Sequence, residues 1–176
     1  FGDSFADISK LNFGIYALAD YYNDKSEQLP VVDVERKMQQ FNVAAGVKMG
    51  RNVGTRGCLY ATFDYQGYYG LKYMKGYSNT LFSGAVKFDY NLKSLLDIKA
   101  ELKYTNDKIA GQKSRHRIHP NLYVGFNVGK RGVFVPYVEV DSYIENNSYQ
   151  SLQGVNPYIL LRDLEYMSVP NTAVYN

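Results

Sequence analysis

Apolar and polar residues alternate with a period of two along most of this chain, beginning at Leu11. Successive side chains of a β-strand point to opposite faces of a sheet, so the alternation predicts strands with one apolar and one polar face. The runs that show this pattern cover residues 11–22, 40–49, 59–66, 82–90, 96–104, 121–128 and 134–141. The sequence therefore predicts an all-β protein.

The connections between these runs alternate in length. Short turns are expected near residues 50–57, 91–95 and 129–132, and longer polar segments near 23–36, 70–80, 105–120 and 144–155. Short periplasmic turns and longer extracellular loops are typical of antiparallel up-and-down β-barrels in bacterial outer membranes. Pro136 cannot donate a ladder hydrogen bond, so it predicts a bulge or an edge near the start of the seventh strand.

The predicted fold is one domain, residues 1–176, that forms a transmembrane β-barrel of about eight antiparallel strands. The eighth strand is the least regular, because residues 157–162 form only a short apolar run and residues 171–176 alternate only briefly. An open sheet edge cannot face lipid. We therefore expect that the tail supplies the eighth strand or that this last strand is incomplete or missing.

The polar face of the predicted strands carries charges of both signs, and the apolar face carries none within the runs. In a membrane barrel the polar face fills the lumen, where opposite charges must pair because an isolated buried charge is costly. The predicted lumenal charge network consists of Asp20, Lys48, Asp64, Lys87, Asp89, Lys99, Glu101, Lys103, Glu139 and Asp141.

A soluble lipocalin-like barrel would show the same alternation with the apolar face inside. Two features favour the membrane barrel. The apolar face is rich in Ala and Gly, which fill a protein core poorly, and its aromatic residues gather near strand ends, as an interfacial girdle requires. The predicted lipid-interface aromatics are Tyr21, Phe41, Tyr65, Phe82, Phe88, Tyr90 and Tyr104.

Composition narrows the class of protein further. The chain has 18 Tyr and 9 Phe but no Trp, a content that suits strands and the water–lipid boundary. No apolar run approaches the roughly 18 residues of a transmembrane helix. A formal net charge of +3, with both signs interspersed, does not indicate a nucleic-acid partner. Cys58 stands alone and cannot form an internal disulfide.

Over residues 11–143, the strand and loop rhythm resembles that of the small outer-membrane barrels, such as the OmpX family and the transmembrane domain of OmpA. The resemblance implies a narrow barrel whose lumen is plugged by side chains, located in the outer membrane of a Gram-negative bacterium. It also implies a structural, adhesive or defensive role at the cell surface, with no catalytic residue.

The densest basic segment is predicted to lie in a long loop and at the top of the following strand. Its candidate lipopolysaccharide-contacting residues are Lys113, Arg115, Arg117 and His119. Arg and Lys recognise phosphate well, although a solvated loop would also account for these charges. If alternation continues through the segment, Arg117 and His119 share the lumenal face with Asn121.

Common catalytic signatures are absent from the sequence, including the Gly-x-Ser-x-Gly elbow and the phosphate-binding glycine loop. We expect no enzyme, no cofactor and no metal site. The expected partners are outer-membrane lipid and lipopolysaccharide, with another envelope protein or a larger assembly as a further option. Two alternatives to a structural or interaction role stay open: a narrow porin-like channel and a soluble lipocalin-like ligand-binding barrel.

Overall fold

The described part of the chain forms eight strands and one short 3-10 helix. The structure, a computed structural model, describes residues 10–24, 38–92, 95–128, 134–146, 148, 150 and 168–175. The elements are β1 (Asn12–Asp24), β2 (Met38–Val53), β3 (Gly57–Leu71), η1 (Lys72–Met74), β4 (Asn79–Leu92), β5 (Leu96–Ile109), β6 (Arg115–Phe126), β7 (Tyr137–Asn146) and β8 (Ser168–Tyr175).

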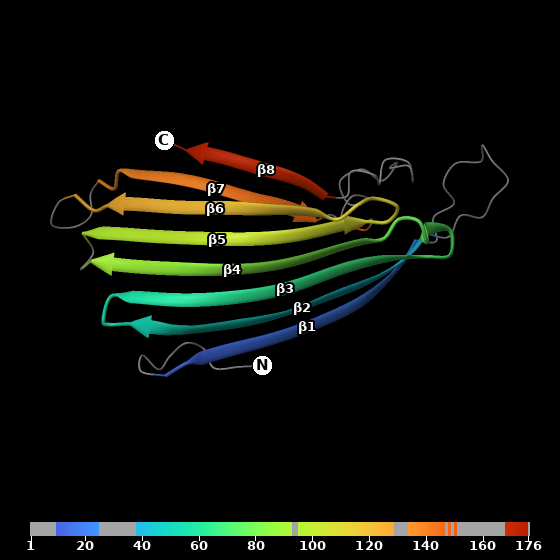
Figure 1. Cartoon of the computed structure of the whole chain (residues 1–176), viewed down its shortest axis with the longest axis horizontal. Helices are drawn as coiled ribbons and strands as arrows, with labels where there is room; N and C mark the ends of the chain where they lie inside the picture. The colour runs from blue at the N-terminus through green and yellow to red at the C-terminus, as the bar shows by residue number, and fades with distance from the viewer. Residues whose placement is uncertain are drawn as a thin grey trace.

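The strands form one sheet in which every strand pairs antiparallel with its neighbour in sequence, in the order β1 to β8 (Figure 1). The longest ladders are in the first five strands; for example, β1 pairs with β2 from Asn12↔Gly50 to Asp24↔Met38. In the described pairing, β1 and β8 are the two edges of an open sheet. The predicted all-β, antiparallel, up-and-down arrangement is confirmed.

The seven alternating runs correspond to β1 to β7, but one expectation about the connections between them was wrong. The predicted long loop at 105–120 is mostly strand, because β5 continues to Ile109 and β6 begins at Arg115. Of the two alternatives for the last strand, the structure shows the first: the tail supplies β8, which pairs with β7 from Glu139↔Tyr175 to Asn146↔Ser168. Pro136 lies directly before β7, as expected for a residue that cannot donate to the ladder.

Two glycines permit tight turns. Gly54 follows β2 with a φ of 66°, and Gly111 lies in the β5–β6 turn with a φ of 78°. Only glycine adopts this left-handed region without strain, so β2 can return into β3 and β5 into β6 over short connections. The β2–β3 turn lies at one end of the sheet, and η1 and the β5–β6 turn lie at the opposite end (Figure 1).

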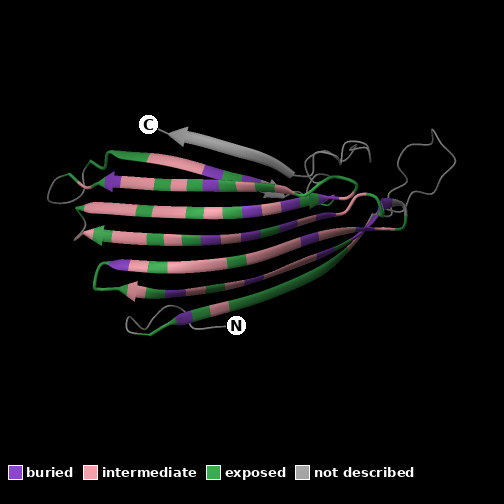
Figure 2. Ribbon diagram, in the orientation of Figure 1, coloured by how far each residue is buried: buried purple, intermediate pink, exposed green. Residues whose placement is uncertain are grey.

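Figure 2 maps the burial of each described residue onto the strands. The kinds of residue that are buried and exposed are inverted relative to a soluble protein. The buried polar residues of the strands include Asn12, Gln39, Gln40, Asn42, Asn79, Ser83, Thr105, Asp107, His119 and Ser142. The exposed large apolar residues include Leu11, Phe13, Ile15, Leu59, Phe63, Val86, Leu102, Ile118, Leu122 and Phe126. A single flat sheet would leave both faces equally open, so this burial pattern indicates that the sheet curves toward its polar face.

Candidate functional site

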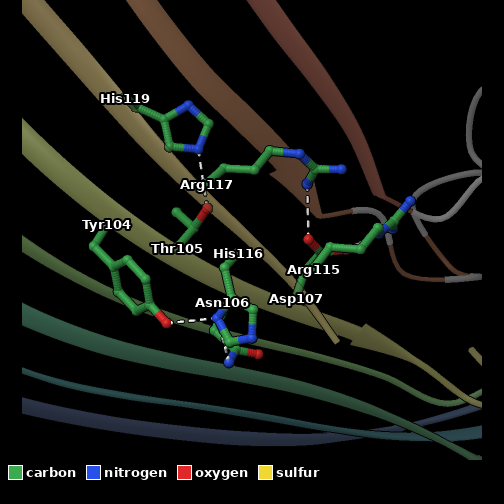
Figure 3. Close-up of polar contacts among 8 residues, drawn as sticks. All are labelled: Tyr104, Thr105, Asn106, Asp107, Arg115, His116, Arg117 and His119. Carbon is green, nitrogen blue, oxygen red and sulfur yellow. Dashed lines mark hydrogen bonds and ion pairs between the residues drawn. The ribbon is translucent and has the colours of Figure 1, made fainter. Parts of the chain in front are cut away.

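A buried carboxylate lies near the β5–β6 turn, on the polar face of the sheet. The side chain of Asp107 has no exposed area, and it forms ion pairs with Arg115 and Arg117 of β6 (Figure 3). Arg115 Nε donates to Asp107 Oδ2 at 2.9 Å, and Arg117 Nη1 donates to Asp107 Oδ1 at 2.7 Å. Each carboxylate oxygen therefore accepts hydrogen bonds from a different guanidinium. Such charge-assisted hydrogen bonds are stronger than those between neutral groups.

Next to this carboxylate, His119 connects three strands through its two ring nitrogens. Nε2 lies 2.9 Å from Thr105 Oγ1 on β5, and Nδ1 lies 2.9 Å from Ser142 Oγ on β7. A serine beside a histidine is also the pair used in nucleophilic catalysis. Here the third group is a hydroxyl rather than a carboxylate, and all three side chains are buried. The chain of bonds satisfies buried polar groups across β5, β6 and β7.

The pairing between β6 and β7 stops part of the way along both strands. It runs only from Gly125↔Tyr137 to Leu122↔Val140. The N–H of Phe126 donates to the carbonyl of Pro136, so the even-numbered residues of β6 direct their backbone groups toward β7. Pro120 occupies such a position and has no N–H to donate, which ends the ladder.

Beyond Pro120, a side chain replaces the backbone acceptor. The N–H of Ser142 donates to Asn121 Oδ1 at 2.6 Å. From this point β7 continues its pairing with β8 as far as Asn146↔Ser168, while β6 continues its pairing with β5 as far as Asp107↔Arg115. We call the unpaired stretch between residues 115–121 of β6 and 141–146 of β7 the β6–β7 break.

The structure corrects the expected location of the basic segment. Lys113 lies exposed in the β5–β6 turn, but Arg115, Arg117 and His119 belong to β6. Arg117 and His119 share the polar face with Asn121, as alternation predicted, whereas His116 lies on the apolar face beside Tyr104, with Tyr104 Oη 2.7 Å from His116 Nδ1 (Figure 3). Sequence reasoning missed the residues that organise this segment, namely Thr105, Asp107 and Ser142.

A cavity of about 470 Å³ lies on the polar face, farther from the β5–β6 turn. Among its lining residues are Lys48, Lys87, Asp89, Lys99, Glu101, Glu139 and Asp141, all from the predicted charge network. The Lys87 ammonium lies 2.7 Å from Glu101 Oε2, and the Lys99 ammonium lies 3.6 Å from Asp97 Oδ2 and 5.2 Å from the centre of the Tyr123 ring. Lysines and carboxylates of this part of the polar face therefore form ion pairs.

The remaining three members of the predicted network lie elsewhere on the polar face. Asp20 accepts a hydrogen bond from Asn42 Nδ2 at 2.8 Å, and Asp64 accepts one from Tyr16 Oη at 2.9 Å. Lys103 stands opposite His119 in the β5–β6 register. The carboxylates of β1 and β3 therefore contact neutral donors, which the prediction of paired charges did not include.

The predicted lipid-interface aromatics lie on the apolar face. The exposed ones are Tyr21, Phe41, Phe82, Phe88 and Tyr104, whereas Tyr65 and Tyr90 are half-buried. The Tyr65 hydroxyl contacts the Tyr69 hydroxyl across Gly67, and the Phe88 and Tyr90 rings stack at 6.3 Å between centroids. The apolar face therefore carries exposed aromatic side chains on several strands.

Comparisons of the chain with protein-family models, curated proteins and solved structures find no match. Among the described residues, no helix has the length and apolar character needed to cross a membrane. The same residues contain no group of three or more His, Cys, Asp or Glu side chains suited to hold a metal ion. The basis for a function is therefore the geometry of the sheet and of its polar face.

Proposed function

We propose that this chain is a bacterial outer-membrane β-barrel with a structural or interaction role. The observation that carries the proposal is the inverted burial: amides, hydroxyls and carboxylates are enclosed, and Leu, Ile, Val and Phe side chains are exposed. Exposed apolar area costs about 25 cal/mol per Å² in water, but it has no such cost in lipid. A lipocalin-like barrel would show the opposite arrangement.

The length of the apolar face also fits a bilayer. On the apolar face, the apolar side chains extend over residues 41–49 of β2, 82–90 of β4, 96–104 of β5 and 118–126 of β6. Each span is about nine residues long, and a tilted strand needs about 9–11 residues to cross the hydrocarbon core. Polar residues follow directly, for example Asn106 beyond Tyr104 and His116 beyond Ile118.

Insertion into lipid requires that the two sheet edges be satisfied. Unpaired N–H and C=O groups cost several kcal/mol each in hydrocarbon, so the proposal includes closure between β1 and β8. The side chains on the polar face then lie in the lumen, with the Asp107 and Lys87–Glu101 ion pairs among them. Ion-paired side chains in the lumen favour a structural or interaction role over a porin-like channel. The proposed partners are outer-membrane lipid and lipopolysaccharide, and another envelope protein through the loop end.

The test is refolding of the full chain with phosphatidylcholine vesicles and, separately, in detergent-free buffer. We expect strand-rich circular dichroism, flotation with the vesicles, and gel migration that changes on heating, as a closed barrel resists the detergent of the gel. In buffer alone we expect aggregation. A folded, soluble monomer in buffer that does not float with vesicles would overturn the proposal and favour the soluble alternative.

A further inference from the structure

The basic residues of the β5–β6 hairpin are divided between its two faces. On the polar face, Arg115 and Arg117 form ion pairs with the buried carboxylate of Asp107. Strand alternation places Lys108 and His116 on the apolar face, and both are exposed. The basic side chains that a ligand can reach from the apolar side are therefore Lys108 and His116.

These two residues lie just beyond the apolar span of the hairpin. The span ends at Tyr104 on β5 and Ile118 on β6, which are opposite each other in the register. Asn106 and His116 form the next row on the same face. Lys108 follows two residues farther along β5, at a rise of about 3.4 Å per residue. In a membrane barrel, both rows lie at the level of the lipid headgroups, directly above the hydrocarbon core.

Two neighbours hold the ring of His116 (Figure 3). Tyr104 Oη lies 2.7 Å and Asn106 Nδ2 lies 3.2 Å from His116 Nδ1, and the Tyr104 and His116 rings stack at 6.1 Å between centroids. An amide nitrogen only donates hydrogen bonds, so Nδ1 accepts and the neutral ring carries its proton on Nε2. The Nε2–H group of His116 is therefore the donor that this ring offers to a ligand.

Among the described residues of β4, β5 and β6, the apolar face carries no carboxylate to balance Lys108. Its register partner on β4 is Thr80, and the β4 partner of Asn106 is Phe82, so both neighbours are uncharged. Asp107 lies between Asn106 and Lys108 in sequence, but its side chain is buried on the polar face. This part of the apolar face therefore offers one cation and neutral donors, a combination that suits an anionic ligand.

From these features, and resting on the proposed membrane location, we infer that the apolar face of the β5–β6 hairpin binds the phosphate of a lipid headgroup, the class of ligand that includes lipopolysaccharide. Lys108 supplies the positive charge, and His116 Nε2 donates a hydrogen bond to a phosphate oxygen. The acyl chains of the same lipid lie along Tyr104 and Ile118. A phosphate free in solution would gain nothing from that apolar surface, so the position of the donors favours a lipid.

The absence of tryptophan allows a site-specific test. Phe82→Trp places a single fluorescent reporter opposite Asn106, and Leu122→Trp places a reference reporter on the apolar face toward the other end of β6. Each protein is inserted into phosphatidylcholine vesicles that contain a small fraction of lipid brominated on its acyl chains. The brominated lipid is phosphatidic acid, whose headgroup is a phosphate monoester, in one series and phosphatidylcholine in the other. Its quenching of tryptophan reports contact.

We expect the Phe82→Trp reporter to show about fivefold stronger association with brominated phosphatidic acid than with brominated phosphatidylcholine, the effect of one or two exposed charged contacts. The Leu122→Trp reporter should show no preference. Lys108→Gln and His116→Phe, each added to the Phe82→Trp protein, should remove most of the preference. Lys103→Gln, which removes a cation from the polar face of the same strand, should preserve it, and circular dichroism checks that each variant is folded.

Asn106→Asp supplies a second line of evidence, because it places a carboxylate on the same face as His116 and Lys108. This anion should repel the phosphate and abolish the preference without lowering the quenching by phosphatidylcholine. Equal quenching by both lipids at Phe82→Trp, or loss of the preference on addition of water-soluble glycerol phosphate at the same concentration, would overturn the lipid phosphate site alone. Absence of quenching at both reporters would overturn the membrane proposal and the lipid phosphate site together.

Discussion

The hydroxyl of Tyr16 on β1 donates to the carboxylate of Asp64 on β3, at 2.9 Å, across the intervening strand β2. The register places both residues opposite Gly46. A Cβ at Gly46 would lie 2.4 Å from Tyr16 Cε1 and 2.5 Å from Asp64 Oδ1. The absence of a side chain at Gly46 therefore allows the tyrosine ring to cover β2 and join two strands that are not neighbours.

Gly46→Ala should displace the Tyr16 ring and break this hydrogen bond. Overpacking of this kind costs about 1–3 kcal/mol, which we expect as a loss in the free energy of unfolding measured by urea titration in vesicles. Gly14→Ala is the matched control, because a Cβ there has no atom within 4 Å. In a Tyr16→Ala background the cost of Gly46→Ala should largely disappear, and an unchanged cost would show that the ring does not cover Gly46.

Val86→Arg tests whether the apolar face meets lipid. Val86 is 55% exposed and lies at the centre of the apolar span of β4. An arginine near the bilayer midplane should destabilise the inserted protein by about 2–4 kcal/mol, measured by chemical denaturation in vesicles. Gln112→Arg, in the exposed β5–β6 turn, should have little effect. Equal stability of the two variants would mean that Val86 faces water.

Asp107→Asn should weaken the loop end of the β5–β6 hairpin, because Arg115 and Arg117 lose the charge of their shared partner. We expect a loss on the order of 2 kcal/mol in the free energy of unfolding, as for hydrogen bonds to charged groups. Lys87→Gln removes a pair in which the lysine is 41% exposed, and it should cost less than about 1 kcal/mol. A larger loss of stability for Lys87→Gln than for Asp107→Asn would mean that the Asp107 ion pairs contribute little to stability.

Asn121→Ala removes the side-chain acceptor of the Ser142 N–H at the β6–β7 break. Hydrogen exchange of the peptide that contains Ser142 should accelerate by about fivefold to tenfold, the effect of losing a hydrogen bond worth about 1 kcal/mol. Exchange in β2 and β3 should stay the same. Asn106→Ala, which changes an amide on the other face of the hairpin, should leave the Ser142 peptide unaffected.

Much of the fold could be predicted from sequence because apolar residues recur at every second position along most of the strands. The prediction failed where that face ends. Beyond Tyr104 and Ile118 both faces of the β5–β6 hairpin are polar, so residues 105–108 and 115–117 have strand geometry without an alternating signal. Strand β8 contains Pro170 and alternates only briefly, which made it equally hard to recognise.

The candidate site was partly predictable for a similar reason. The period of two correctly placed Arg117 and His119 on one face with Asn121, because residues two apart on a strand lie on the same face. It could not show that Asp107 lies opposite Arg115, since register depends on the length of a turn fixed by Gly111. Contacts across a whole strand, such as Tyr16 with Asp64, leave no signature in the order of residues.

The short junction between β6 and β7 also sets how the sheet would respond to force. A pull on the β7–β8 hairpin would load the short ladder from Leu122↔Val140 to Gly125↔Tyr137, together with the few hydrogen bonds that Asn121, His119 and Phe126 make to the β7 side. The next boundary, between β5 and β6, is paired along nearly its whole length. The sheet therefore has a mechanical weak point two strands from its end, and unravelling from that side would pause at β6.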